Sequence, residues 1–179
     1  MALPTDIKPP EYRPQPPQSK PPSCFPANVA ICLSNGDQLA ISECRPGMSI
    51  IGTRIDSLKL QSVVIGQCKK FKPSDLIRIT ARNYSIDTTP LHSFRSDRGW
   101  RRANRLKIGD KLYVLNNNRL ELTEIDDIKI ISYLEPVYNL YVPETGNFLA
   151  NRFLVSCFGF FPAIRIRILH LIARLRGKI

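Results

Sequence analysis

The stretch SKPPSCFPANVAICLSNGDQ, residues 19–38, changes character at a single residue, Cys24. Before it, residues 1–23 contain eight of the fifteen prolines of the 179-residue chain and almost no aliphatic side chains. Such a composition favours an extended, polyproline-like and largely disordered segment. After Cys24, short apolar segments typical of β-strands begin. The sequence therefore predicts that a folded domain starts at Cys24.

The segments after Cys24 are short, rich in Val, Ile and Tyr, and separated by turn sequences such as SNGD, RPGM, KIGD, LNNN and PETGN. They read VAICL, SIIG, SVVIGQ, LIRITARNYSID, KLYVL, IDDIKIISYL, VYNLYV and NFLANRFLVSCF. With 43% hydrophobic residues, the chain can build one domain with a real core. The pattern predicts an all-β domain made of many short strands.

Two segments of this domain resemble each other. SNGDQLAISECRPGMSII (34–51) and SDRGWRRANRLKIGDKLY (96–113) share a turn, a polar and apolar stretch, and a glycine followed by a strand, at an offset of 62 residues. This internal similarity predicts two related β-subdomains.

The end of the chain has a different pattern. From Phe158 to Ile179 there is no acidic residue, and apolar residues recur at helical spacing: Ile164, Ile168, Leu171, Ile172, Leu175 and Ile179. Arginines surround them, which predicts a basic amphipathic helix over the 159–179 tail, starting near Pro162. Its IRIRI segment alone also fits a strand. The helix would either lie on a membrane surface through residues 160–179 or dock on the β-domain.

The charge balance is strongly basic. The chain has 26 Lys and Arg against 15 Asp and Glu, a net charge of +11, which favours contact with nucleic acid or anionic membrane. In RGWRRANRLK, a tryptophan among arginines could stack on bases, and a nucleic-acid binder would show steep salt dependence. The turn-and-strand pattern accounts for the same segment, so we expect no nucleic-acid partner.

The five cysteines predict reactivity in at least one thiol. Their number is odd, and no C-x-x-C or paired Cys/His spacing occurs, so we expect no metal site and no cofactor. Cys24 stands where disorder meets fold and has little to pack against on one side. It is the candidate reactive thiol, and inert packing is the alternative.

His92 is the candidate acid or base. It lies in DTTPLHSF, three residues after Thr89, so that a hydroxyl and an imidazole surround one turn and could reach the same peptide group. The alternative is a histidine buried in the core for packing.

Together these segments resemble a known family. CFP at 24–26, RPGMSI, TTPLH, GWRRANRLKIGDKLYVL and VYNLYVPETGNFLANRFLVSCF resemble the Hint domain shared by hedgehog autoprocessing domains and inteins. The closing NRFLVSCF looks like the hedgehog branch, which ends in N-x-x-x-x-S-C. The resemblance spans Cys24 to about Phe158. It implies a Hint domain over 24–158 with two pseudo-symmetric β-subdomains.

The resemblance also implies a reaction. The Cys24 thiol would attack the carbonyl of Ser23 and convert the Ser23–Cys24 amide into a thioester. His92 would protonate the departing amine, and Thr89 would hold the peptide. The chain would be a single-turnover, monomeric autoprocessing enzyme whose substrate is its own segment 1–23. The alternative is an inactive Hint fold that serves as a binding or membrane-associated module through its basic tail.

The second step separates the branches of the family. Inteins end in a His-Asn pair that frees the downstream segment, whereas this chain has Ser156 and Cys157 there, so the resemblance implies no splicing. Cys157 would be an auxiliary thiol, with buried packing as the alternative. Cholesterol-using hedgehog domains carry an aspartate base near the position of Gln67, Cys68 and Lys69 here; Asp75 is the nearest carboxylate. The nucleophile stays open among a sterol or other lipid alcohol, water, a thiol and an amine.

The first twenty residues contain no apolar run like a signal-peptide core. No stretch reaches the roughly 18 apolar residues that span a bilayer. The sequence predicts either an intracellular protein or one whose true start lies upstream, which would place it in the secretory pathway or outside the cell.

Overall fold

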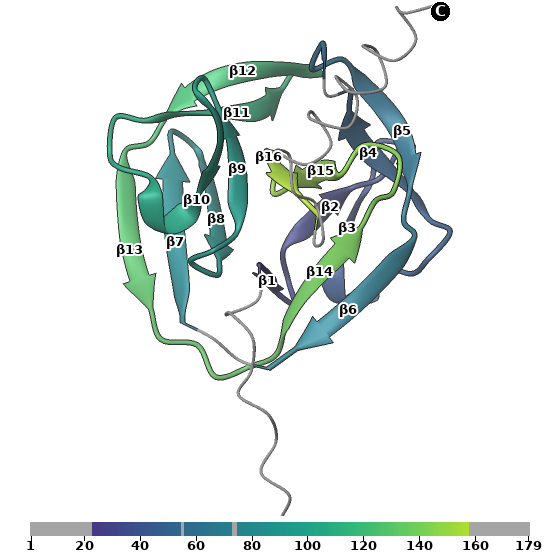
Figure 1. Cartoon of the computed structure of the whole chain (residues 1–179), viewed down its shortest axis with the longest axis horizontal. Coiled ribbons are helices and arrows are strands. Elements are labelled where there is room, and N and C mark those ends of the chain that lie inside the picture. The colour runs from purple at the N-terminus through teal and green to yellow at the C-terminus, as the bar shows by residue number, and fades with distance from the viewer. Residues whose placement is uncertain (1–22, 55, 73–74, 158–179) are drawn as a thin grey trace, which may run out of the picture.

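The computed structural model describes residues 23–54, 56–72 and 75–157. Within these residues it has sixteen β-strands, two short 3₁₀ helices and no α-helix, which confirms the all-β prediction. Figure 1 shows the strands arranged around a ring, with four of them on its rim: β5 (Leu60–Val64), β6 (Gln67–Phe71), β12 (Arg119–Glu124) and β13 (Asp127–Ile131). The predicted tail helix at 159–179 and the proline-rich residues 1–22 lie outside the described residues.

The largest sheet has eight strands. Along its path they are β10 (Gly99–Arg102), β9 (Ser93–Ser96), β11 (Lys111–Asn116), β16 (Phe153–Ser156), β15 (Asn147–Ala150), β2 (Ala30–Cys32) and β3 (Gln38–Ala40), and β12 pairs with β11. This sheet joins the beginning of the domain, through β2, to its end, through β15 and β16.

Three smaller sheets complete the ring. One is β1 (Phe25–Pro26), β14 (Val137–Tyr141) and β6; another is β13, β7 (Leu76–Ala81) and β8 (Tyr84–Thr88); the last pairs β4 (Ser49–Thr53) with β5. All of these pairings are antiparallel. Because β14 lies between β1 and β6, the start of the domain is fixed beside residues 137–141.

Two segments that the sequence predicted as single strands are hairpins. LIRITARNYSID forms β7 and β8, which turn at Arg82 with a φ of 52°. NFLANRFLVSCF forms β15 and β16, which turn at Asn151 and Arg152 with φ values of 43° and 70°. Two-residue turns with positive φ match the twist of paired strands, and Asn adopts them readily.

The internal similarity is visible in the structure. The first segment contains β3, the 3₁₀ helix η1 (Ile41–Glu43) and β4, and the second contains β10, η2 (Ala103–Arg105) and β11. Each counterpart lies 62 residues later, including Gly47 and Gly109, with φ of 88° and 89°. Both glycines precede a strand in a conformation that other residues rarely adopt, which explains why each segment has glycine there.

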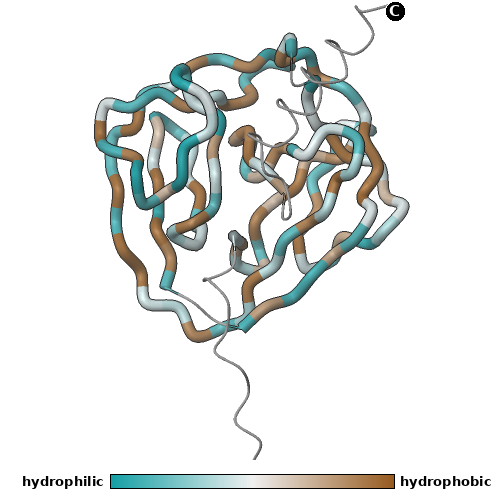
Figure 2. Tube along the Cα trace, viewed as in Figure 1, coloured by the Kyte–Doolittle hydropathy of each residue, from teal (hydrophilic) through white to brown (hydrophobic). Residues whose placement is uncertain are grey.

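The core gathers inward-facing residues from most of the strands, since successive residues of a strand point to opposite faces. Figure 2 shows hydrophobic and hydrophilic residues following one another along them. The largest fully buried side chains include four phenylalanines: Phe25, Phe94, Phe148 and Phe153. Phe25 brings the first described strand into this core, and thereby fixes the residues that precede it.

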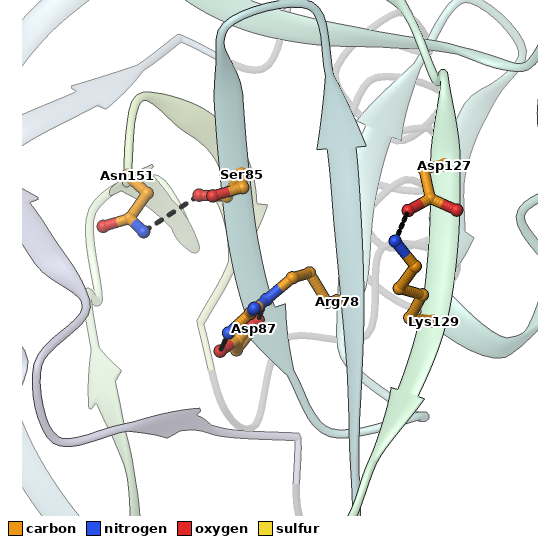
Figure 3. A network of polar contacts seen from close by, with 6 residues as sticks. All are labelled: Arg78, Ser85, Asp87, Asp127, Lys129 and Asn151. Atoms are coloured by element: carbon orange, nitrogen blue, oxygen red, sulfur yellow. Dashed lines mark hydrogen bonds and ion pairs between the residues drawn. The ribbon is translucent and has the colours of Figure 1, made fainter.

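Polar contacts attach the β7–β8 hairpin to the turn between β15 and β16. Asn151 donates its side-chain amide to the Ser85 carbonyl at 3.0 Å (Figure 3). Its amide oxygen accepts the Ala30 N–H at 2.7 Å. Arg78 and Asp87 form a bidentate pair across the hairpin at 2.7 Å. The half-exposed ion pair adds little stability. Asn151 therefore ties the hairpin to the β15–β16 turn in addition to the pairing of β7 with β13.

Replacing Asn147 with alanine should destabilise the domain by about 2–4 kcal/mol, because Asn147 is buried and bridges β4 and β15. Its amide oxygen accepts the Thr53 N–H at 2.7 Å and its amide nitrogen donates to the Thr53 carbonyl at 3.0 Å. Urea unfolding measures the change, with the exposed Asn104→Ala as control. Equal stability of the two variants would contradict this role.

Candidate active site

The peptide bond between Ser23 and Cys24 is held at both of its polar groups. The Cys24 N–H donates to the Thr89 hydroxyl at 2.8 Å, and the side-chain amide of Asn139 donates to the Ser23 carbonyl in a short hydrogen bond. These side chains lie 65 and 116 residues further along the chain. A peptide group at the start of a domain usually needs no such partners, so the fold holds this bond in one orientation.

The β7–β8 hairpin delivers Thr89 to this peptide. Beyond the end of β8, the Thr89 N–H donates to the Cys24 carbonyl at 2.9 Å, and the Thr88 hydroxyl donates to the same carbonyl at 3.2 Å. Thr88 and Thr89 are both fully buried. Buried threonine hydroxyls require partners, and here the backbone of Cys24 supplies them.

His92 follows in the same turn, where its backbone N–H donates to the Thr89 carbonyl at 3.1 Å. The ring is fully buried, with its centroid 4.1 Å from that of Phe25 and 5.9 Å from that of Phe94. Neither ring nitrogen makes a hydrogen bond of normal geometry. The backbone of Ser23 and Ser156 nevertheless lies close enough to influence the ring's protonation. The imidazole is thus beside the Ser23–Cys24 peptide.

Burial decides the charge of this ring. Desolvation lowers the pKa of His92 from 6.5 to about 3, and the backbone groups of Ser23 and Ser156 offset only part of this effect. The imidazole is therefore neutral at neutral pH. It becomes an acid only after taking up a proton during a reaction, and it would then release that proton readily.

Cys24 is also buried and neutral. Its residue is 0% exposed and packs with Leu76 and Val137. Desolvation raises the pKa of the thiol far above its ordinary value, so the thiolate does not exist at rest. A nucleophilic Cys24 has to lose its proton as it attacks.

Asn139 is the site residue that the sequence did not reveal. It lies in β14, is fully buried, and its amide oxygen accepts the Leu140 N–H at 2.7 Å, which orients the amide nitrogen toward Ser23. The available signal was a polar side chain at an inward position of VYNLYV, between Val137 and Tyr141. A buried amide needs a partner, but the partner follows from the pairing of β1 with β14.

Ser156 and Cys157 lie at the end of β16, on the His92 side of the core. Cys157 is 3% exposed, its N–H donates to the Gly146 carbonyl at 2.9 Å, and its thiol lies 3.9 Å from the Val142 carbonyl oxygen. Of these two residues, Ser156 is the one whose backbone lies close enough to the His92 ring to affect its pKa. The predicted auxiliary thiol, Cys157, directly follows Ser156 in the chain.

The residues considered for a sterol base lie on β6. Gln67, Cys68 and Lys69 pair with Tyr141, Leu140 and Asn139, and Asp75 lies beyond the strand and is exposed. All five cysteines are free thiols. Across residues 23–54, 56–72 and 75–157, no group of three His, Cys, Asp or Glu side chains is arranged to bind a metal ion. No helix among the described residues is both long and apolar enough to span a membrane.

The fold is that of inteins. A variant of the Ssp DnaB mini-intein superposes with a TM-score of 0.72 at 20% identity, covering 78% of this chain and 97% of that one. A DnaB intein from Synechocystis gives 0.72 at 21% identity, with 76% and 99% covered. A bacterial intein-like domain from Clostridium thermocellum gives 0.67 at 22% identity, also with 76% and 99% covered. These likenesses support the predicted Hint fold.

No protein-family model matches the sequence, and no curated protein matches it either. The matched structures named above are inteins or intein-like, so the closer resemblance to hedgehog domains stays a prediction.

The buried neutral His92 should make folding stability depend on pH. Its pKa is lower in the folded than in the unfolded chain, so the unfolded chain binds more protons below pH 6.5, and stability falls as pH falls toward about 3. In a Cys24→Ala background, urea unfolding between pH 6.5 and 5 should show a loss of up to about 1.4 kcal/mol per pH unit. The same background with His92→Gln should lose less. Parallel losses in both proteins would show that His92 is not buried in its neutral form.

Proposed function

We propose that this domain cleaves its own chain between Ser23 and Cys24 through a thioester. The observation that carries the proposal is the pair of hydrogen bonds on that one peptide, from Asn139 to its carbonyl and from its N–H to Thr89. Ordinary packing would not require side chains from two distant segments to converge on the bond that precedes a buried cysteine. The Hint-like fold supports the same reaction class by analogy.

The first step uses the groups already around the bond. The Cys24 sulfur attacks the Ser23 carbonyl carbon, and the oxygen, which becomes negatively charged, keeps the Asn139 amide as its donor. Neutral His92 takes the thiol proton and passes it to the Cys24 nitrogen as the carbon–nitrogen bond breaks. Thr89 accepts the N–H of that nitrogen and holds it for protonation. The net result is a thioester at Cys24 and a free amine, with no change in total protons.

The step is uphill, since it replaces a resonance-stabilised amide. It is completed when a second nucleophile takes the acyl group from Cys24. Segment 1–23 then leaves as an acid, ester, amide or thioester, and Cys24 becomes the first residue of the remaining chain. Covalent catalysis of this kind divides one difficult cleavage into two easier steps.

Splicing is not part of the proposed function. Release of a downstream segment in inteins relies on a terminal asparagine, whereas this chain has Cys157 there, after Ser156. A thiol side chain has no amide nitrogen that could attack the backbone. The proposed reaction is hedgehog-like and is limited to cleavage at the N-terminal side of Cys24. Cys157 remains the proposed auxiliary thiol, and a lipid alcohol gathered by residues 160–179 is one of the candidate nucleophiles of the second step.

The direct test is intact-mass spectrometry of wild type and Cys24→Ala, with and without dithiothreitol. Wild type should yield a 1–23 fragment, as an acid or thiol adduct, and a 24–179 fragment, whereas Cys24→Ala should stay whole. Cys32→Ala is the matched control, because Cys32 is also a buried free thiol but lies in β2. The proposal fails if wild type keeps its full mass, or if Cys24→Ala is cut.

Asn139→Leu should slow thiol-induced cleavage by about 10²–10³-fold, since loss of one oxyanion donor typically has this effect. Leucine has a similar shape but no donor for the Ser23 carbonyl. Time courses of the 24–179 fragment measure the rate, and Asn104→Leu, at an exposed position of η2, controls for asparagine replacement as such. If folded Asn139→Leu cleaves at the wild-type rate, Asn139 has no role in the step.

A further inference from the structure

Lys69 of β6 lies opposite Asn139 of β14, the residue whose side-chain amide holds the Ser23 carbonyl. The antiparallel register of β14 and β6 pairs Asn139 with Lys69, and paired residues project from the same face with Cβ atoms about 4.5–5.5 Å apart. Asn139 is fully buried whereas Lys69 is exposed. The Ser23–Cys24 peptide, Asn139 and Lys69 therefore follow one another across neighbouring strands, and Lys69 is at the exposed end.

Lys70, the next residue of β6, points to the opposite face of the sheet. Lys70 pairs with Tyr138, and its ammonium lies 5.9 Å from the centre of that ring. Because neighbouring residues of a strand point to opposite faces, Lys70 is directed away from the Asn139 face. Of these two adjacent lysines, Lys69 is the one aligned with the acyl group.

The surroundings of β6 add to the positive charge. β6 is an edge strand of its sheet and lies on the rim of the ring (Figure 1). Lys72 follows directly after the strand and is exposed. A nucleophile that approaches Asn139 from this edge passes Lys69 first.

This charge discriminates between classes of nucleophile. An alcohol or water must lose a proton as it attacks and benefits from a base, but an ammonium group is not a base at neutral pH. A thiol ionises with a pKa near 8.5, and a neighbouring lysine favours its thiolate. A second negative charge on the same small molecule would strengthen its attraction to the edge of β6.

We propose that the nucleophile of the second step is a small anionic thiol, which Lys69 recruits to the Ser23 carbonyl. The inference rests on the proposed function, because it requires the thioester at Cys24. The incoming thiolate forms a carbon–sulfur bond to Ser23 as the bond to the Cys24 sulfur breaks. Cys24 leaves as a thiolate and takes a proton from solvent, which replaces the proton lost by the incoming thiol. Segment 1–23 departs as a thioester of the small molecule, and no oxidant or reductant is needed.

Three two-carbon thiols of different charge test this inference on the full chain: 2-mercaptoethanesulfonate, 2-mercaptoethanol and cysteamine. Cleavage rates, corrected for the thiolate fraction of each, should rank from the anionic to the cationic thiol. The ratio of the sulfonate rate to the cysteamine rate should fall about tenfold in Lys69→Gln. In Lys69→Glu it should fall further and reverse the preference, and in wild type it should fall in roughly 1 M salt. Lys70→Gln, the neighbour on the opposite face, should keep the wild-type ratio.

The ratio isolates the second step, because a variant that merely slows thioester formation lowers all three rates together. If wild type and Lys69→Gln cleave with the same ratio, Lys69 does not select the nucleophile and the inference falls while the proposed function stands. If Lys70→Gln changes the ratio as much as Lys69→Gln, recruitment is not specific to the Asn139 face and the inference also falls. If no thiol cleaves wild type, the proposed function fails first.

Discussion

The pairing of β1 with β14 is the constraint on which the site depends. Phe25 opposite Tyr138 and Pro26 opposite Val137 fix the start of the domain against the middle of β14, and the buried Phe25 ring secures it. Two residues before Phe25, the Ser23 carbonyl accepts the side-chain amide of Asn139, the neighbour of Tyr138. The β8 end then closes the other side with Thr88 and Thr89. Without this pairing, the peptide would belong to an unattached segment and would have no fixed partner.

The electrostatics of the site suit a reaction that creates charge only transiently. Both the thiol and the imidazole are neutral at rest because burial disfavours their charged forms, which raises the pKa of Cys24 and lowers that of His92. A proton that passes from sulfur to nitrogen by way of the ring leaves the interior neutral at the end. The positive edge of β6 lies outside this neutral interior. In our proposal the external nucleophile is selected at this edge, whereas the Ser23–Cys24 peptide is activated in the interior.

Much of the fold was accessible from sequence because turns and strand lengths are local. The glycine-centred repeats and the turn from Thr89 to His92 depend on nearby residues. The hairpin at Arg82 was missed because an arginine is a rare turn residue with positive φ, and the apolar pattern continues across it. Asn139 and Lys69 could not be assigned roles, since each acquires one through the register of strands far apart in the chain.

The central claim is that the Ser23–Cys24 bond, and no other, is the one that reacts. The chain contains only two Ser–Cys bonds, Ser23–Cys24 and Ser156–Cys157. Protein labelled with NMR-active carbon at serine carbonyls and NMR-active nitrogen at cysteine amides therefore gives two carbonyl-to-amide correlations, which Cys24→Ala assigns. During incubation with thiol, we predict that the Ser23–Cys24 correlation disappears while the Ser156–Cys157 correlation persists as an internal control. Persistence of both, or loss of Ser156–Cys157 instead, would contradict the account.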